Sequence, residues 1–375
     1  MLVGCIKESS EFERRVALVP DVIPVLKKLG WEAIIERGAG ISAGYSDEEY
    51  VARGGLVASR EEVLDRSEIL FVVSRPSPEI DVVENAIIVG GLNPFVDPKG
   101  LLKFEDKNIT LFSLELLPRI AKVQNMDILT SMGLITGYWA VIAASSMLKK
   151  VIPMMPTAAG TIPPSRFLVI GAGVAGLTAL VMAKRMGADV YGYDVRPAAN
   201  EQIKSVGAKL LEQPLEDEAA EDKTGYARYL GEEFYEKQRR FFEESLKNFD
   251  VVIATAGVPG KRAPLLISEE AVRRMRPGSV IVDLVADRGG NCELTESGKT
   301  VVKHGVSILG PMNPPSELPH HSSLLYSRNL VNFLQYLFKK GEREIDLNDP
   351  VIADTLIMEK GKVVSKTFKS LVGEG

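Results

Sequence analysis

The chain contains the stretch Arg166-Phe-Leu-Val-Ile-Gly-Ala-Gly-Val-Ala-Gly-Leu-Thr-Ala-Leu180, which decides its fold class. An apolar run at 167–170 precedes three glycines and an Ala- and Leu-rich helical pattern, which predicts a strand, a tight turn and a helix. Gly171 permits the turn, Gly173 lets a pyrophosphate approach the backbone, and Gly176 lets the helix lie close to the strand. Free N–H groups at the helix N-terminus favour phosphates. The stretch therefore predicts a dinucleotide-binding turn, and the alternative is an ordinary tight α/β crossover.

A carboxylate closes the next predicted strand. This strand, at 189–193, ends at Asp194. A carboxylate there accepts hydrogen bonds from the adenosine ribose hydroxyls and repels a 2'-phosphate, which favours NAD over NADP. Arg196 lies two residues further on and keeps NADP open as an alternative.

Size and composition limit the classes of function. The chain has 375 residues, enough for two domains, and a net charge of −5 that gives no basic field for nucleic acid. Its two cysteines, Cys5 and Cys292, form no disulfide framework and no zinc motif, so a reducing compartment is expected. The adjacent His320 and His321 are expected to be loop residues rather than metal ligands, and we predict no metal.

One uncharged segment, 128–148, is long enough to span a bilayer. Serine, threonine and glycine residues are spread through it, so we expect a long buried helix between domains, with a membrane span as the alternative. The apolar run that follows Met1 is short and is followed by charges, which predicts a first strand rather than a signal peptide.

Short apolar runs alternate with helical patterns along the rest of the chain. This alternation predicts an α/β protein with two doubly wound domains, one of them a Rossmann domain, joined by long interdomain helices. The expected first domain comprises 1–126 and 311–375, the interdomain helix 127–150, and the Rossmann domain 151–310. The predicted first-domain strands are 2–6, 32–36, 69–73, 86–89 and 110–113. The predicted Rossmann strands are 167–170, 189–193, 209–212, 251–254, 279–282 and 306–309.

The order of these pieces resembles the soluble NAD(H)-binding component of proton-translocating nicotinamide nucleotide transhydrogenase, a family related to alanine dehydrogenase. The resemblance covers essentially the whole chain. Its motifs are Lys7-Glu8 with Arg15-Val-Ala-Leu-Val-Pro20, Leu117-Pro-Arg-Ile-Ala-Lys-Val-Gln-Asn-Met-Asp-Ile-Leu-Thr130, Met155-Pro-Thr-Ala-Ala-Gly-Thr161, the glycine turn, Asp194-Val-Arg196 and Gly225-Tyr-Ala227. The second of these is the most specific.

The resemblance implies roles for individual residues. Arg119, Gln124 and Asp127 match a loop that lies against the nicotinamide, and Thr130 stands where a relative has serine; these four are the expected catalytic positions. Asp127 is also a candidate helix N-cap, and both roles are compatible. The other expected nucleotide contacts are Ile128, Gly171, Gly173, Val174, Gly176, Asp194, Val195, Arg196, Gly225, Tyr226, Gln238 and Gly257. Tyr226 lies in an acidic segment, 212–230, whose length suggests a mobile lid.

The implied activity is hydride transfer from or to NAD(H) on this chain, with NADP(H) on a partner subunit. The resemblance further implies a homodimer, membrane-embedded partner subunits that translocate protons, and a cytoplasmic location at the inner face of the membrane. The competing hypothesis is an alanine dehydrogenase, which needs titrating groups beside its substrate. The Lys and His of that pattern are missing, because Ser74-Arg75-Pro76 and Gly91-Leu92-Asn93 stand in their places, and only Arg15 remains. A third hypothesis is a non-catalytic NAD-binding subunit.

Overall fold

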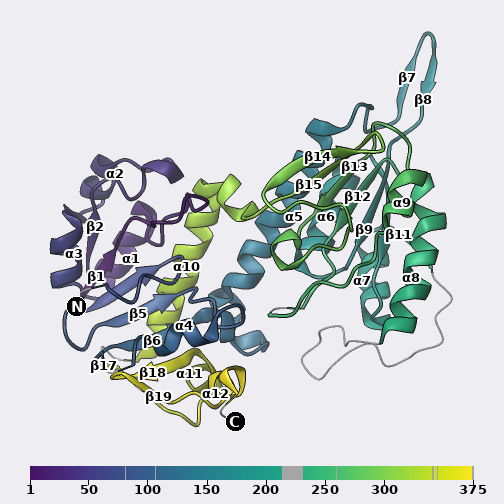
Figure 1. Cartoon of the computed structure of the whole chain (residues 1–375). Helices are drawn as coiled ribbons and strands as arrows, with labels where there is room; N and C mark the ends of the chain where they lie inside the picture. Colours follow the sequence, from purple (N-terminus) through teal and green to yellow (C-terminus); the bar gives the residue numbers. More distant parts are fainter. Residues whose placement is uncertain are drawn as a thin grey trace. The chain divides into compact units, whose positions relative to one another are not determined.

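Strands and helices alternate along the chain, and the computed structural model confirms the predicted α/β class with two mostly parallel sheets. The structure describes residues 1–373 except 81, 106, 213–230, 259, 340, 341 and 344, and not the side chains of 339, 342 and 343. The chain divides into two units: unit 1 is Met1–Met132 with Pro315–Gly375, and unit 2 is Gly133–Pro314. Each unit is described by itself (Figure 1).

Unit 1 contains an eight-stranded sheet with the order β19-β18-β6-β5-β4-β1-β2-β3. The strands β1 to β6 are parallel, and β18 and β19 add an antiparallel edge beside β6. The strand order reverses between β1 and β4, and an α/β sheet binds ligands at such a reversal. The bounds are β1 Leu2–Cys5, β2 Glu32–Glu36, β3 Leu56–Ala58, β4 Ile69–Val72, β5 Ile87–Gly90, β6 Thr110–Ser113, β18 Leu356–Glu359 and β19 Lys362–Val363.

The helices of unit 1 begin where the sequence carries capping signals. Ser46 with Glu49 and Ser59 with Glu62 form reciprocal capping boxes at the starts of α2 and α3. The helices are α1 Ile23–Lys28, α2 Asp47–Ala52, α3 Arg60–Arg66, α4 Pro98–Leu102, α10 Pro319–Leu337, α11 Pro350–Thr355 and α12 Lys366–Val372, with the 3-10 turns η1 Pro20–Val22, η2 Ile41–Ala43, η3 Leu114–Leu116 and η4 Ala121–Met126. A small hairpin, β16 Phe338–Lys339 with β17 Glu342–Arg343, follows α10.

Unit 2 has the strand order of a dinucleotide-binding fold, β11-β10-β9-β12-β13-β15, with β14 as an antiparallel edge strand beside β15. All six predicted Rossmann strands are present, and β14 was not predicted. The bounds are β9 Arg166–Ile170, β10 Asp189–Tyr193, β11 Lys209–Leu210, β12 Val251–Ala254, β13 Val280–Asp283, β14 Lys299–Lys303 and β15 Val306–Gly310. The order reverses between β9 and β12, so these two strands define the ligand edge of the sheet.

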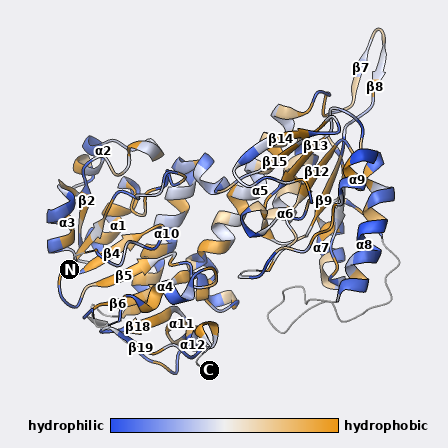
Figure 2. Cartoon of the chain, in the orientation of Figure 1, coloured by the Kyte–Doolittle hydropathy of each residue, from blue (hydrophilic) through white to orange (hydrophobic). Residues whose placement is uncertain are grey.

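Hydrophobic central strands and polar outer helices give unit 2 its core (Figure 2). Strand residues such as Val169, Ile253 and Val282 are buried in it. The helices are α6 Val174–Arg185, α7 Pro197–Ser205, α8 Glu232–Ser245 and α9 Glu269–Arg274, with the 3-10 turns η5 Leu246–Asn248 and η6 Ala286–Arg288; η7 Pro314–Glu317 follows β15.

The uncharged helix α5, Ile128–Met147, is a core helix. It is the one helix in the described part of the chain that is long and apolar enough to cross a membrane. Ala140, Val141 and Ala144 are nevertheless fully buried in the core of unit 2. A Cβ on Gly137 would lie 2.2 Å from the carbonyl oxygen of Ala175, so α5 packs against the backbone of α6. This contact explains the small residues in α5.

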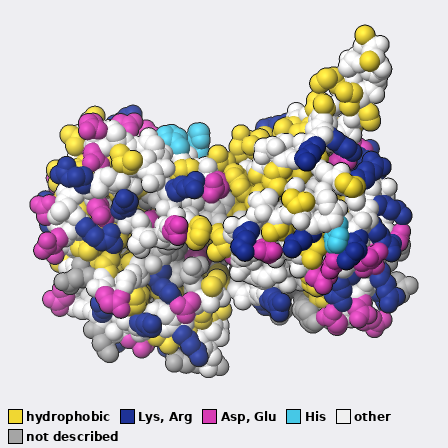
Figure 3. Space-filling model, turned by 45° about the horizontal axis from the view of Figure 1, so that its top comes forward, with side chains coloured by type: hydrophobic (Ala, Val, Ile, Leu, Met, Phe, Trp, Pro, Cys, Tyr) yellow, Lys and Arg dark blue, Asp and Glu magenta, His cyan; other side chains and the backbone are white. Residues whose placement is uncertain are grey.

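The segment before β9 forms a hairpin rather than a single extended entry. Its strands are β7 Met155–Thr157 and β8 Gly160–Ile162, paired antiparallel. Figure 1 shows this hairpin projecting from unit 2, and Figure 3 shows apolar side chains along it. Met154, Met155 and Ile162 are exposed.

Candidate nucleotide-binding site

The three glycines of the turn after β9 are required for three different reasons. Gly171 has φ +96°, a left-handed conformation that other residues rarely adopt. A Cβ on Gly176 would lie 1.8 Å from the carbonyl oxygen of Gly171, so no larger residue fits there. Gly173 has ordinary φ and ψ values and no atom within 4 Å of an added Cβ. Gly173 therefore leaves open space beside the backbone, where a pyrophosphate would approach.

The N-terminus of α6 has no side-chain cap. Gly173 is the N-cap residue, and it offers no side-chain oxygen to the first-turn N–H groups. Val174, the first helical residue, is exposed. Uncapped N–H groups and the helix dipole favour an anion at this end of the helix.

Asp194, directly after β10, lies beside the glycine turn. Its Oδ2 accepts a hydrogen bond of 2.7 Å from the N–H of Ala172. Arg196 donates to the same carboxylate through Nε and Nη2, each at 2.9 Å, and through its backbone N–H. The Asp194 side chain is only 6% exposed. The structure therefore brings two predicted contacts, Asp194 and Arg196, into one buried ion pair.

The loop after β12 forms the other side of the ligand edge. Thr255 donates from Oγ1 to the carbonyl of Gly171 at 2.9 Å. The fully buried Asn291 side chain accepts from the N–H of Ala256 at 3.0 Å and donates to its carbonyl at 2.8 Å. These bonds hold the loop that carries Gly257. Sequence reasoning missed Thr255 and Asn291, because nothing in the local pattern distinguishes them.

The remaining predicted contacts in unit 2 lie behind this edge or outside the described residues. Gln238 on α8 is fully buried and donates from Nε2 to the hydroxyl of Tyr193, and its Oε1 has no hydrogen-bond partner among the described residues. Val195 packs against the core next to β10. Gly225 and Tyr226 lie outside the described residues.

The predicted nicotinamide loop belongs to unit 1 and includes η4. Val123 and Met126 are buried, whereas Gln124 is exposed between them; Arg119 is exposed before η4. Asp127 accepts from the N–H and the hydroxyl of Thr130 at 3.0 and 2.6 Å, which is the geometry expected of an N-cap of α5. Ile128 is buried in the core of unit 1. Gln124, Asp127 and Thr130 thus share one short turn.

Two carboxylates of the chain itself occupy the ligand edge of the unit 1 sheet. Glu8, which follows β1, accepts from the N–H groups of Val73 and Ser74 at 2.7 and 3.3 Å, directly after β4. Glu115 accepts from the N–H groups of Leu92 and Asn93, after β5. The backbone donors at the strand ends are therefore already paired.

Arg15, the remaining residue of the alanine dehydrogenase pattern, is paired inside the same cluster. Its Nε and Nη2 donate to Glu13 at 2.7 and 2.6 Å, and the two side chains are 11% and 2% exposed. A substrate carboxylate would have to displace Glu13 to reach this guanidinium. The arrangement indicates a structural role for Arg15.

We predict that Glu8 makes the stability of unit 1 depend on pH. Burial raises the pKa of Glu8 to about 7 from its ordinary value of 4.5, with a further increase from Glu13. The folded state then holds the proton more tightly than the unfolded state, so the stabilisation is complete below about pH 4.5 and is lost as the pH rises through about 7. The shift corresponds to roughly 1–3 kcal/mol.

Chemical denaturation between pH 5 and 7.5 tests this prediction. Glu8→Gln should flatten the fall in the free energy of unfolding, because glutamine does not ionise. Glu11→Gln, which changes an exposed carboxylate on the same segment, should leave the slope as in the wild type. Parallel curves for the wild type and Glu8→Gln would contradict the prediction.

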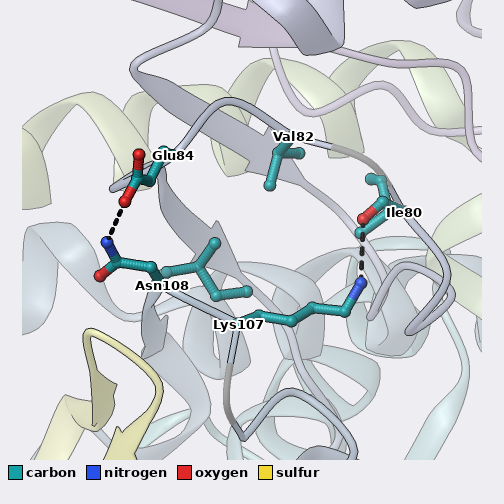
Figure 4. A pocket seen from close by; sticks show the side chains of 6 residues that line it. Ile80, Val82, Glu84, Lys107 and Asn108 are labelled. Carbon is teal, nitrogen blue, oxygen red and sulfur yellow. Dashed lines mark hydrogen bonds between the residues drawn. The ribbon is translucent and has the colours of Figure 1, made fainter.

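A surface cavity of about 220 Å³ in unit 1 lies away from every predicted site residue (Figure 4). It is lined by Ile80, Val82, Glu84, Lys107, Asn108 and Ile109. Asn108 donates to Glu84 at 2.8 Å and Lys107 to the carbonyl of Ile80 at 3.4 Å, so its polar groups pair with one another. The lining residues precede β5 and β6, at the amino ends of the strands, whereas α/β sheets bind ligands at the carboxyl ends. The cavity is therefore not part of the candidate site.

The strand order of unit 2, its glycine turn and Asp194 define the class of dinucleotide-binding α/β proteins. Comparison with known proteins narrows this class. The model described as "Alanine dehydrogenase/PNT, N-terminal domain" matches residues 4–136, and "Alanine dehydrogenase/PNT, C-terminal domain" matches residues 140–366. The chain belongs to the alanine dehydrogenase/PNT family, whose members bind NAD(H).

Individual relatives agree with this assignment. The chain is 41% identical over 387 residues to an NAD(P) transhydrogenase alpha subunit of Rickettsia prowazekii, covering 100% of both. It is 28% identical to the alanine dehydrogenase of Methanococcus maripaludis, covering 97% of this chain and 94% of the relative. Among solved structures, the transhydrogenase of Sinorhizobium meliloti is 36% identical with a TM-score of 0.86, covering 97% of this chain and 100% of that one. The predicted family resemblance is confirmed.

Proposed function

We propose that this chain is the NAD(H)-binding subunit of a proton-translocating NAD(P) transhydrogenase. In this function it exchanges a hydride between NAD(H) bound here and NADP(H) bound by a partner subunit. The observation that carries the proposal is full-length similarity to a transhydrogenase subunit, combined with an intact glycine turn and Asp194 in unit 2.

The residues present fit a dinucleotide. The open space at Gly173 and the uncapped N-terminus of α6 suit a pyrophosphate. Asp194, at the end of the neighbouring strand, suits the adenosine ribose hydroxyls. Its ion pair with Arg196 also occupies the guanidinium that would otherwise attract a 2'-phosphate. These features favour NAD(H) over NADP(H).

The site requires orientation rather than proton handling. Bound NAD(H) supplies the hydride, and transfer between two nicotinamides exchanges no proton with water. In this proposal the Gln124 amide, with a donor and an acceptor, orients the carboxamide or ribose of the nicotinamide half. Asp127 and Thr130 hold the turn from which Gln124 extends.

Alanine dehydrogenase activity is the weaker alternative. Oxidative deamination requires a proton acceptor beside the substrate. The positions expected to supply it carry Ser74 and Asn93 instead, and the N–H groups of both residues are bonded to Glu8 and Glu115. A substrate would find neither free donors nor the expected base at this edge.

The proposed subunit acts within an assembly. We propose a homodimer, an NADP(H)-binding partner and membrane-embedded partners that translocate protons, with this chain peripheral on the cytoplasmic face. The exposed apolar residues of the β7–β8 hairpin support self-association, because uncharged projecting hairpins with exposed methionines favour protein contacts. A monomer in sedimentation at micromolar concentration would contradict the homodimer.

Reconstitution tests the activity. The purified chain, mixed with membranes that contain the NADP(H)-binding and membrane subunits but lack this subunit, should transfer hydride from NADPH to an NAD⁺ analogue. The same chain should produce no NADH from NAD⁺ and L-alanine. Alanine-dependent NADH formation would replace the proposal with an amino-acid dehydrogenase, and NADH binding without any hydride transfer would indicate a non-catalytic subunit.

A further inference from the structure

The carbonyl oxygen of Asn125, next to Gln124, accepts two side-chain hydrogen bonds from one helix. Asn329 and Asn332 of α10 donate from Nδ2 at 2.8 and 2.9 Å. Residues three apart lie on the same face of a helix, so the two amides form a fork that points at one atom. The peptide that follows Gln124 is therefore held by side chains more than two hundred residues further along the chain.

The Asn329 side chain is not fully satisfied by this contact. It is 5% exposed, and its Oδ1 has no hydrogen-bond partner among the described residues. Burying an amide oxygen without a partner is unfavourable. An apolar residue would avoid this penalty, so what the asparagine provides at this position is its donor to Asn125.

A second attachment on α10 holds the same turn. Lys122 donates to the hydroxyl of Tyr336 at 2.8 Å and lies 4.8 Å from the centre of its ring. Tyr336 in turn donates to Asp349, the N-cap residue of α11. With Val123 and Met126 buried in the core, η4 is held on both sides of the exposed Gln124.

We propose that Asn329 and Asn332 are positioning residues of the hydride-transfer site. By fixing the carbonyl of Asn125, they set the direction in which Gln124 extends and keep the turn rigid. The inference rests on the proposed function, in which Gln124 orients the nicotinamide. A displacement of about 1 Å at such a group costs on the order of a hundredfold in rate.

The test uses Asn332→Asp, an isosteric change that removes the donor and places a carboxylate against a carbonyl. Asn332 is only half-buried, so the variant is expected to fold. Gln335→Glu is the matched control, because Gln335 is an exposed amide on the same helix and receives the same change of charge. Full-length proteins are measured with the partner subunits.

In Asn332→Asp, hydride transfer should be about 10- to 100-fold slower, while the Kd for NADH changes less than about twofold. Gln335→Glu should match the wild type in both. A normal transfer rate in Asn332→Asp, or a loss of NADH affinity as large as the loss of rate, would overturn the inference. If the wild type itself transfers no hydride, the proposed function fails and not the positioning.

Hydrogen exchange gives a readout that does not depend on activity. The N–H groups of Val123 and Asp127, bonded to Ile120 and Gln124, should exchange faster in Asn332→Asp and at the wild-type rate in Gln335→Glu. Equal exchange in the two variants would overturn the inference. Should Asn332→Asp fail to fold, Asn332→Ala removes the donor without adding charge and must give the same pattern.

Discussion

Replacing Gly173 by alanine is expected to leave the protein folded and to weaken NADH binding about 10- to 100-fold. No atom lies within 4 Å of the added Cβ, and the backbone conformation suits alanine. The methyl group would occupy the space through which the pyrophosphate reaches the N–H groups of α6. Losing one or more hydrogen bonds to a charged group corresponds to about 1.5–3 kcal/mol.

Gly176→Ala is the matched contrast and should fail in a different way. Its Cβ would lie 1.8 Å from the carbonyl of Gly171, so strand, turn and helix must move apart. We expect a loss of about 3 kcal/mol or more in stability. Thermal unfolding and NADH titration of both variants distinguish the two roles. An unstable Gly173→Ala protein, or one that binds NADH as the wild type does, would contradict the predicted approach of the pyrophosphate.

Asp194 should control both affinity and the choice of nucleotide. In Asp194→Ala, NADH binding is expected to weaken by about 1.5–3 kcal/mol, because one charge-assisted hydrogen bond to the ribose is lost. The guanidinium of Arg196 would also lose its partner and become available to a 2'-phosphate. NADPH should therefore bind more tightly to the variant than to the wild type.

Two companion variants separate these effects. Asp194→Asn keeps an acceptor for the N–H of Ala172, so it tests the charge without disturbing the turn. Adding Arg196→Ala to Asp194→Ala should abolish the gain in NADPH affinity. Calorimetric titration with NADH and NADPH measures both effects. Unchanged NADH affinity in Asp194→Ala would remove Asp194 from the site.

Parts of the fold were predictable because their cause is local. Alternating apolar runs and breakers predicted all six parallel strands of unit 2, and the capping boxes at Ser46 and Ser59 marked two helix starts. Strands β3 and β14 were missed. β3 has only three residues, and β14 is an edge strand whose side chains are largely exposed, so neither carries the apolar run that marks a buried strand.

The sequence by itself determined the glycine turn and the carboxylate after β10, because positive φ and a strand end are properties of a few neighbouring residues. Only the tertiary structure decided which distant groups these residues meet. Asn291 holds Ala256, Asn329 and Asn332 hold Asn125, and Glu8 closes the edge after β4. Such partners depend on the order of strands in a sheet and on the face a helix presents. Neither is contained in the residues that surround each group along the chain.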